Sequence, residues 1–200
     1  MSQRGTALIG ILLGLVLLGA VAGLAIALPK ATDEDSAGDD RRPAVELPDE
    51  LPHGLVAQDR LSDETADRYT EAQASAVEGL EEIYGDDAEV RGYATEDGNT
   101  QATVTVLDRA PGLFDPHGPP VDPGLYDLER MVYELRRVGD AVCDLYWAQS
   151  VPKGQPVDDA AEPASMQCQL GDGDRTIELF ASGLTLDEGI DVLESLVQDQ

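Results

Sequence analysis

The residue types that most often carry catalysis are scarce in this chain of 200 residues. It contains two cysteines, Cys143 and Cys168, two histidines, His53 and His117, and no G-x-S-x-G motif around a serine. A catalytic nucleophile needs a neighbouring base, and a zinc site needs several histidine or cysteine ligands. Both cysteines lie in alternating apolar stretches typical of strands, so a reactive pair with His117 is not expected. The sequence therefore predicts no catalytic residue, no cofactor and no metal ligand.

Carboxylates are so abundant that no single pair is informative. The chain has 40 aspartates and glutamates, whereas general acid–base catalysis needs a group with a shifted pKa in a cleft. An exported hydrolase that uses carboxylates is kept as one alternative function. A calcium-binding module is another, because hard cations prefer oxygen ligands. Asp172-Gly173-Asp174 and Asp158-Asp159 do not match an EF-hand loop, and they are interpreted as a hairpin turn and a solvated loop.

A segment rich in proline and glycine, residues 108–121, carries the remaining residues with a candidate role. Leu113, Phe114 and His117 lie in it, flanked by aspartates. These side chains could form an apolar interaction patch with an acidic rim. The alternative, which we favour from the sequence, is that Leu113 and Phe114 pack into the core and fix the course of the loop.

The charge balance limits the partners. The net charge is −27, with 13 basic residues in the whole chain. Such a field repels nucleic-acid phosphates and attracts cations and basic proteins. The sequence therefore excludes a nucleic-acid partner and is compatible with a basic partner in the cell envelope. An acidic bias of the whole proteome would explain the same composition, and nothing in the sequence indicates an oligomeric state.

Residues 6–28 contain no charged side chain. A helix of this length measures about 35 Å at about 1.5 Å per residue, which is enough to cross a hydrocarbon core of about 30 Å. We expect this segment to contact the lipid bilayer as an uncleaved signal-anchor helix. A cleaved signal peptide is the alternative, because Ala20-Val21-Ala22 and Ala25-Ile26-Ala27 fit the small-residue cleavage pattern.

The anchor divides the chain into segments. Residues 1–5 form a short tail, and its length and basic character favour a cytoplasmic N-terminus. Residues 29–60 combine an acidic cluster with four prolines and are expected to be a disordered linker. Residues 61–200 form the predicted domain. The predicted location is the cell membrane, with a single span and with this domain on the extracytoplasmic side.

The first half of the predicted domain contains two helices and a hairpin. A helix is expected from Ser62 to Tyr84, and Gly85 can end it. Its apolar residues recur at helical spacing and are expected to form one buried face: Tyr69, Ala72, Ala76, Leu80, Ile83 and Tyr84. Two alternating stretches, 88–94 and 102–106, predict a hairpin with a three-residue loop, which places Val90 opposite Val106. A two-residue turn at Asp97-Gly98 is the alternative, but it is not preferred because it would place Arg91 opposite Val104. A second helix is expected from Asp122, which would cap it, to Gly139, with Leu135 in its apolar stripe.

The second half is predicted to contain three strands and a final helix. The strands are centred on Cys143, Cys168 and Ile177, and Trp147 is expected on the core face of the first. The pairing of the first two strands places both sulfur atoms together. An exported domain with two cysteines is expected to form that disulfide. A two-residue turn at Asp172-Gly173 would set Cys168 opposite Ile177. The last helix is expected to begin at Thr185 with a capping box.

These elements define an α+β fold with the order helix-β-β-helix-β-β-β-helix. We expect an antiparallel sheet of about five strands with the helices packed on one face. The function predicted from the sequence is that of a membrane-anchored, exported domain that is not an enzyme and that binds a partner in the cell envelope.

Overall fold

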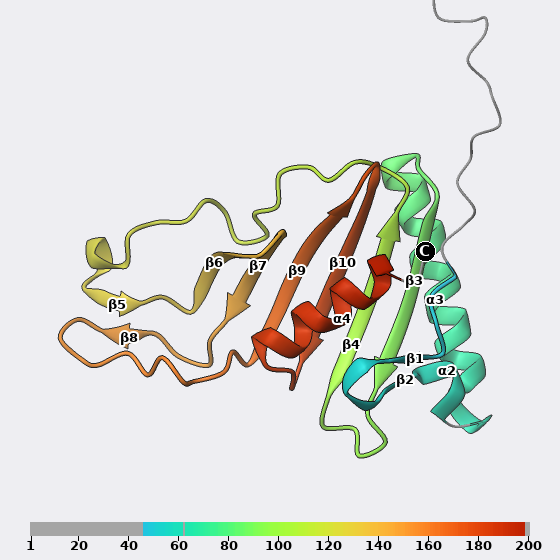
Figure 1. Ribbon diagram of the computed structural model, residues 1–200, viewed down its shortest axis with the longest axis horizontal. Helices are drawn as coiled ribbons and strands as arrows, with labels where there is room; N and C mark the ends of the chain where they lie inside the picture. The colour runs from blue at the N-terminus through green and yellow to red at the C-terminus, as the bar shows by residue number, and fades with distance from the viewer. Residues whose placement is uncertain (1–45, 62, 199–200) are drawn as a thin grey trace, which may run out of the picture. The chain divides into compact units, whose positions relative to one another are not determined.

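The computed structural model describes residues 46–61 and 63–198, and these residues form an α+β fold (Figure 1). The main sheet is antiparallel with eight strands in the order β1-β2-β3-β4-β10-β9-β7-β6, and β5 and β8 form a separate pair. The expected sheet of about five strands was therefore too small. The predicted anchor helix 6–28 lies outside the described residues. Within the described part of the chain, no helix combines the length and the apolar character that crossing a membrane requires.

Helical elements precede β3, lie between β4 and β5, and follow β10. The helical elements are η1 (Pro52–Gly54), α2 (Gln58–Leu61), α3 (Asp63–Tyr84), η2 (Pro123–Tyr126) and α4 (Leu186–Gln198). The strands are β1 (Glu50–Leu51), β2 (Leu55–Ala57), β3 (Ala88–Ala94), β4 (Gln101–Leu107), β5 (Leu128–Arg130), β6 (Tyr133–Val138), β7 (Ala141–Tyr146), β8 (Val151–Pro152), β9 (Ser165–Asp172) and β10 (Arg175–Ser182).

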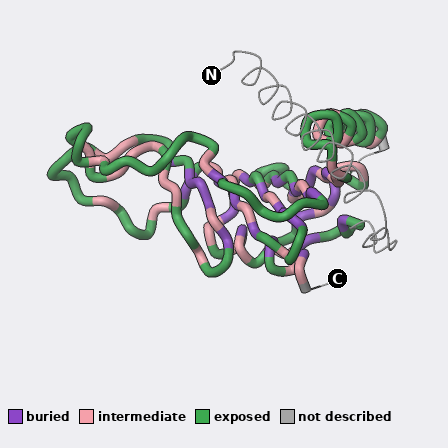
Figure 2. Tube along the Cα trace, turned by 90° about the horizontal axis from the view of Figure 1, so that it is seen from above, coloured by how far each residue is buried: buried purple, intermediate pink, exposed green. Residues whose placement is uncertain are grey.

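The two long helices lie on opposite sides of the sheet, as Figures 1 and 2 show from two directions. The expectation that they share one face was wrong. Helix α4 covers the core face, where Val192, Leu193 and Leu196 are buried together with Leu179 and the other inward residues of the central strands. Thr185 and Glu188 form the predicted capping box at its start, with the Thr185 N–H donating to Glu188 Oε2 at 2.9 Å. This hydrogen bond lowers the pKa of Glu188.

Helix α3 confirms the predicted helix but not its predicted buried face. Tyr69, Ile83 and Tyr84, which we expected to be buried, are exposed, and Ile83 is 73% accessible. Figure 2 shows that buried residues gather in the sheet and that this helix is exposed along most of its length. The apolar residues of α3 recur at helical spacing, but only a narrow side of the helix contacts β3. Periodicity therefore identified the helix without identifying the side that packs.

The strands that carry the cysteines follow the predicted pairing. Cys143 lies opposite Cys168 and Leu145 lies opposite Met166, and a disulfide joins the two cysteines. The neighbouring register differs, because Cys168 lies opposite Leu179 rather than Ile177. The turn is at Gly173-Asp174, one residue later than expected, which shifts the pairing by two residues. A shift of two keeps every side chain on its face, so the pattern of apolar residues could not distinguish the two registers.

The register of the β3–β4 hairpin was predicted wrongly. Val90 lies opposite Thr105, and Arg91 lies opposite Val104 on the core side of the sheet. The prediction matched apolar residues as if one face of β3 were buried and the other exposed. Residues on both faces of β3 are buried, including Val90 on one and Tyr93 on the other. Alternation therefore could not identify a single core face for this strand.

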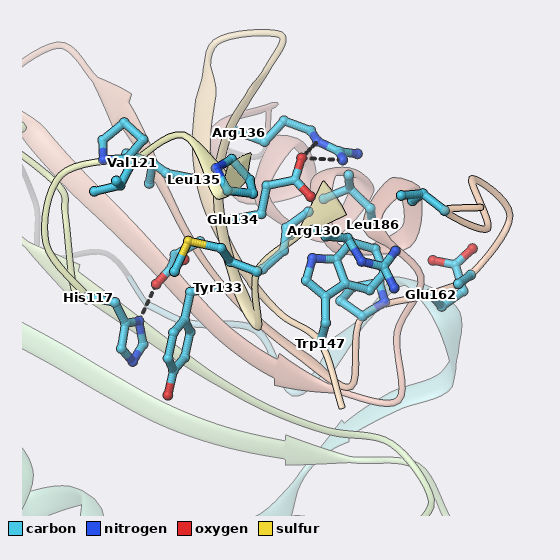
Figure 3. Close-up of a pocket in the computed structure, with 18 of the residues that line it drawn as sticks. His117, Val121, Arg130, Tyr133, Glu134, Leu135, Arg136, Trp147, Glu162 and Leu186 are labelled. Atoms are coloured by element: carbon cyan, nitrogen blue, oxygen red, sulfur yellow. Dashed lines mark hydrogen bonds and ion pairs between the residues drawn. The ribbon is translucent and has the colours of Figure 1, made fainter. Parts of the chain in front are cut away.

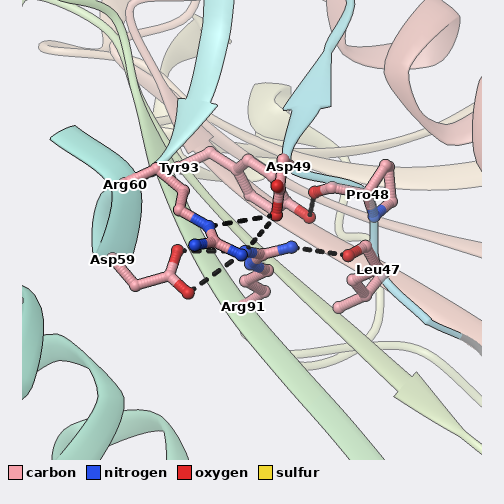
Figure 4. Close-up of polar contacts among 7 residues, drawn as sticks. All are labelled: Leu47, Pro48, Asp49, Asp59, Arg60, Arg91 and Tyr93. Carbon is pink, nitrogen blue, oxygen red and sulfur yellow. Dashed lines mark hydrogen bonds and ion pairs between the residues drawn. The ribbon is translucent and has the colours of Figure 1, made fainter.

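Arg91 can occupy the core side because the N-terminal segment surrounds its guanidinium group (Figure 4). Its nitrogens donate to the carbonyl oxygen of Leu47 at 2.6 Å, to Asp49 Oδ1 at 2.6 Å and to both carboxylate oxygens of Asp59 at 3.1 Å. The Tyr93 hydroxyl donates to the carbonyl oxygen of Pro48 at 2.9 Å. The hydrogen bond from Arg91 lowers the pKa of Asp49, and burial raises the pKa of Tyr93.

These contacts also correct the predicted extent of the linker. The disordered linker was expected to run to residue 60, yet β1, η1, β2 and α2 lie between residues 50 and 61. Leu47, Leu51 and Leu55 are buried in the core. Their spacing of four residues is compatible with a helix, but prolines interrupt the segment, so no element could be predicted for it. The rest of the predicted linker, residues 29–45, lies outside the described residues.

The helix predicted from Asp122 to Gly139 is not formed. Asp122 caps only the short helix η2, which ends at Asp127 in a left-handed conformation. Strands β5 and β6 follow, and β6 pairs with β7 through a two-residue turn at Gly139-Asp140. Gly139 therefore occupies a hairpin turn with a φ of 58° rather than a helix end. Pairing with β7 outweighs the helical spacing of the apolar residues.

Candidate binding site

A cavity of about 770 Å³ lies along β6, the last strand of the main sheet. Residues 115–121 of the loop rich in proline and glycine form one wall. Residues 157–163 and the start of α4 form the opposite wall. Figure 3 shows His117 and Tyr133 at one end of the cavity, Trp147, Arg130 and Leu186 at the other, and Glu134 with Arg136 between them. The cavity therefore follows an edge of the sheet and receives residues from both of its faces.

The outer edge of β6 is open to pairing. The backbone N–H of Trp147 donates to the backbone carbonyl oxygen of Val132 at 2.8 Å. The backbone groups of Val132 therefore point toward the segment that continues β7. Because this direction alternates along an antiparallel strand, the backbone N–H and C=O groups of Tyr133, Leu135 and Arg137 point outward. No strand in the described part of the chain pairs with this edge. An edge of this kind can accept an additional strand.

Trp147 and Arg130 form the inner end of the cavity. The guanidinium carbon of Arg130 lies 3.8 Å from the centroid of the indole ring, and Trp147 is only 5% exposed. The Trp147 Nε1 and Arg130 Nε donors are both buried, and neither has a hydrogen-bond partner among the described residues. A buried polar group without a partner costs about 1–3 kcal/mol. Trp147 Nε1 and Arg130 Nε are therefore two buried donors that a ligand's hydrogen-bond acceptor could satisfy.

The cavity is strongly acidic. Eight carboxylates line it against two guanidinium groups, those of Arg130 and Arg136. Several carboxylates already have partners: Glu134 accepts from Arg136 at 2.5 Å, and Glu129 accepts from the Gly154 N–H at 2.8 Å. Asp159, Glu162 and Asp187 have no ion pair or hydrogen bond to another described side chain. These three carboxylates belong to the wall formed by residues 157–163 and the start of α4, and they favour a cationic ligand.

The predicted interaction loop contributes only one of its three candidate residues to the cavity. Phe114 is buried, as expected for a residue that pins the loop, whereas Leu113 is 89% exposed and does not pack into the core. His117 lies in the cavity wall, and its ring stacks on Tyr133 with centroids 3.6 Å apart. Its Nδ1 atom pairs with the buried carboxylate of Asp144. His117 and Phe114 therefore attach the loop to the sheet.

Of the other sequence-predicted features, the disulfide and the β9–β10 turn do not line the cavity, whereas Asp158 and Asp159 do. Cys143 and Cys168 form the disulfide in the core. Gly173-Asp174 is the turn between β9 and β10, and Asp158 accepts a hydrogen bond from the Ala160 N–H at 3.0 Å. Across the described residues, no group of three or more histidine, cysteine, aspartate or glutamate side chains is placed to hold a metal ion.

The main residues of this site were missed in the sequence. Leu135 was assigned to the buried stripe of a helix, so β6 was not recognised as an edge strand. Arg130 lay in the same predicted helix, and Trp147 was assigned only to a core face. The pair Gly139-Asp140 between two short alternating stretches is the signal for a hairpin that could have revealed β6. The stack of Arg130 on Trp147 has no signal in the sequence, because it depends on how β5 lies relative to β7.

Comparison with known proteins leaves the site to be interpreted from its own geometry. No protein-family model, no curated protein and no solved structure matches the chain.

Proposed function

We propose that the protein is a membrane-anchored, exported domain without a catalytic role that binds a partner of the cell envelope. The partner would contribute an extended basic segment, which lies along β6 in the acidic cavity. The observation that carries this proposal is the open edge of β6 beside a cavity with eight carboxylates and two guanidinium groups. The edge provides backbone pairing, and the carboxylates provide charge complementarity.

Strand addition explains how such a segment would be held. The outward N–H and C=O groups of Tyr133, Leu135 and Arg137 would pair with its backbone. Basic side chains of the segment would then meet the carboxylates of Asp159, Glu162 and Asp187. Backbone pairing would give affinity for any extended chain, and the acidic walls would select a basic one. The selectivity should weaken as salt is added, because exposed charges are screened.

The remaining parts of the chain support an envelope location. Residues 6–28 are uncharged and long enough to anchor the protein in a bilayer. The Cys143–Cys168 disulfide fits an oxidising compartment outside the cytoplasm. We propose that the acidic residues 29–45 separate the domain from the membrane surface, so that the β6 edge is accessible to a partner.

Replacing Leu135 by proline tests the proposal. Leu135→Pro removes an N–H that points outward, so pairing with β7 is kept, whereas an added strand loses a hydrogen bond and meets the proline ring. We expect chemical crosslinking in intact membranes, followed by purification, to recover a partner with the native protein and at least tenfold less with this variant. The matched control is Leu113→Pro, the same substitution in an exposed loop, which should recover the partner normally.

The salt dependence of recovery provides a second check on the same partner. Recovery with the native protein should fall as ionic strength rises, because charge complementarity contributes to binding. The proposal is wrong if Leu135→Pro, folded as judged by its unfolding midpoint, recovers as much partner as the native protein. It is equally wrong if intact membranes give no reproducible partner.

A further inference from the structure

We infer that the indole face of Trp147 is a binding site for an arginine side chain of the partner, and that Arg130 occupies this site in the free protein. Arg130 thus acts as an internal competitor, which the partner's guanidinium group displaces. This inference rests on the proposed function in one respect, namely that the partner segment is basic. It specifies that the partner's recognised side chain is an arginine and that Trp147 recognises it. It also specifies that the contact of Arg130 with Trp147 lowers the affinity for the partner.

The position of Arg130 is unusual for an arginine in such an acidic cavity. Eight carboxylates line the same cavity, yet Arg130 forms no ion pair with any described residue. Its guanidinium group lies instead on the indole ring, 3.8 Å from the ring centroid. A guanidinium group over a tryptophan face is attracted by the π-electrons of the ring. The structure therefore shows directly that this face accepts a guanidinium group.

The attachment of Arg130 allows it to move away. Arg130 is the last residue of β5, which pairs only with the two-residue strand β8, and the register of this pair is irregular between Leu128 and Arg130. Figure 1 shows this pair beyond the end of the main sheet. Trp147, by contrast, directly follows β7, which pairs with β9 and β6 in the main sheet, and it is almost fully buried. The aromatic site is therefore fixed, whereas its occupant lies on a small, separate element.

The surrounding charges favour a guanidinium ligand over an anionic one. Asp159, Glu162 and Asp187 line the cavity and form no ion pair with another side chain in the described part of the chain, and they would repel a carboxylate. A partner arginine on the indole face could donate to these carboxylates, which Arg130 does not do. The buried Trp147 Nε1 donor has no partner among the described residues, and a backbone carbonyl oxygen of an extended segment would supply one. An arginine within a strand-like segment thus satisfies both features.

The test uses the full-length protein in lipid nanodiscs and a small probe, N-acetyl-arginine amide. Trp147 is the single tryptophan of the chain, so its fluorescence reports directly on the site. The Arg130→Ala variant should bind the probe at least tenfold more tightly than the native protein, because the internal competitor is removed. Arg130→Gln, which keeps most of the side-chain length without the charge, should change affinity in the same direction. The matched control Arg109→Ala removes an arginine that lies over the ring of Tyr84, outside the cavity, and should leave the affinity unchanged.

The neutral isostere N-acetyl-citrulline amide separates charge recognition from general stacking, and it should bind at least tenfold more weakly to Arg130→Ala than the arginine probe does. Trp147→Leu should abolish binding of the arginine probe in calorimetric titration.

The inference is overturned if the Arg130 variants bind the arginine probe no better than the native protein does, or if the arginine and citrulline probes bind equally. Such a result alongside a loss of partner with Leu135→Pro would remove this inference and leave the proposed function standing. A gain in probe affinity together with normal recovery of the partner by Leu135→Pro would support this inference and remove the proposed function.

Discussion

Replacing Cys143 and Cys168 together by alanine is expected to lower the free energy of unfolding by about 3–4 kcal/mol. The disulfide joins β7 to β9 across 25 residues, and a crosslink of this span restricts the unfolded chain. Both residues are fully buried. Alanine is therefore a better replacement than serine, which would bury a hydroxyl group without a partner. Loss of the two sulfur atoms from a packed core adds a smaller destabilisation of the native state.

Urea unfolding followed by circular dichroism measures this effect. A reducing agent should destabilise the native protein by a similar amount and should leave the double alanine variant unchanged. The variant thus serves as its own control for other effects of the reducing agent. A loss of less than about 1 kcal/mol would mean that the crosslink does not stabilise this sheet.

Replacing Leu193 by alanine is expected to cost about 2–5 kcal/mol. Leu193 is fully buried on the side of α4 that covers the core face of the sheet. Alanine would leave a cavity there, because the capping box at Thr185 and Glu188 and the adjacent core residues hold the helix in place. The start of α4 also forms a wall of the candidate binding site through Leu186 and Asp187. Loosening this helix should therefore weaken partner binding as well as stability.

Leu113→Ala is the matched control, since it makes the same substitution at a residue that is 89% exposed. Its unfolding free energy should change by no more than about 0.5 kcal/mol. Equal effects of the two substitutions in denaturant unfolding would contradict the placement of α4 against the sheet.

The parts of the fold that the sequence predicted are those with strong local signals. The capping box at Thr185 and the glycine at position 85 set helix boundaries without help from distant residues. The pairing of Cys143 with Cys168 was also predictable, because it brought two cysteines together and matched apolar faces in one register. The neighbouring register was wrong by two residues, since both arrangements bury the same side chains.

The errors occur where distant contacts decide the structure. Leu135 has helical spacing with other apolar residues, but it lies in β6 because pairing with β7 completes the hairpin. Arg91 appeared incompatible with a core position, but Asp49 and Asp59 surround its guanidinium group. The position of Leu135 depends on strand pairing, and that of Arg91 depends on residues far away in the sequence. The periodicity of apolar residues in a single sequence encodes neither.

The same limitation explains why the candidate site was missed. His117 was singled out in the sequence as part of an exposed loop, and it lies in a wall of the cavity. The open edge of β6 could be recognised only once its pairing was known. The stack of Arg130 on Trp147 joins two residues from different elements. The acidic composition pointed to a basic partner, but the place where such a partner could bind required the arrangement of the strands.

The most direct measurement is site-specific photocrosslinking in sealed membranes that contain the full-length protein. A photoreactive residue at position 135 would lie on the open edge of β6, and one at Phe180 would lie on an exposed part of β10 that does not line the cavity. The account predicts that position 135 captures a partner peptide rich in lysine and arginine, mapped by mass spectrometry, and that position 180 does not. Capture of the same partner from position 180 alone, or none from position 135, would contradict it.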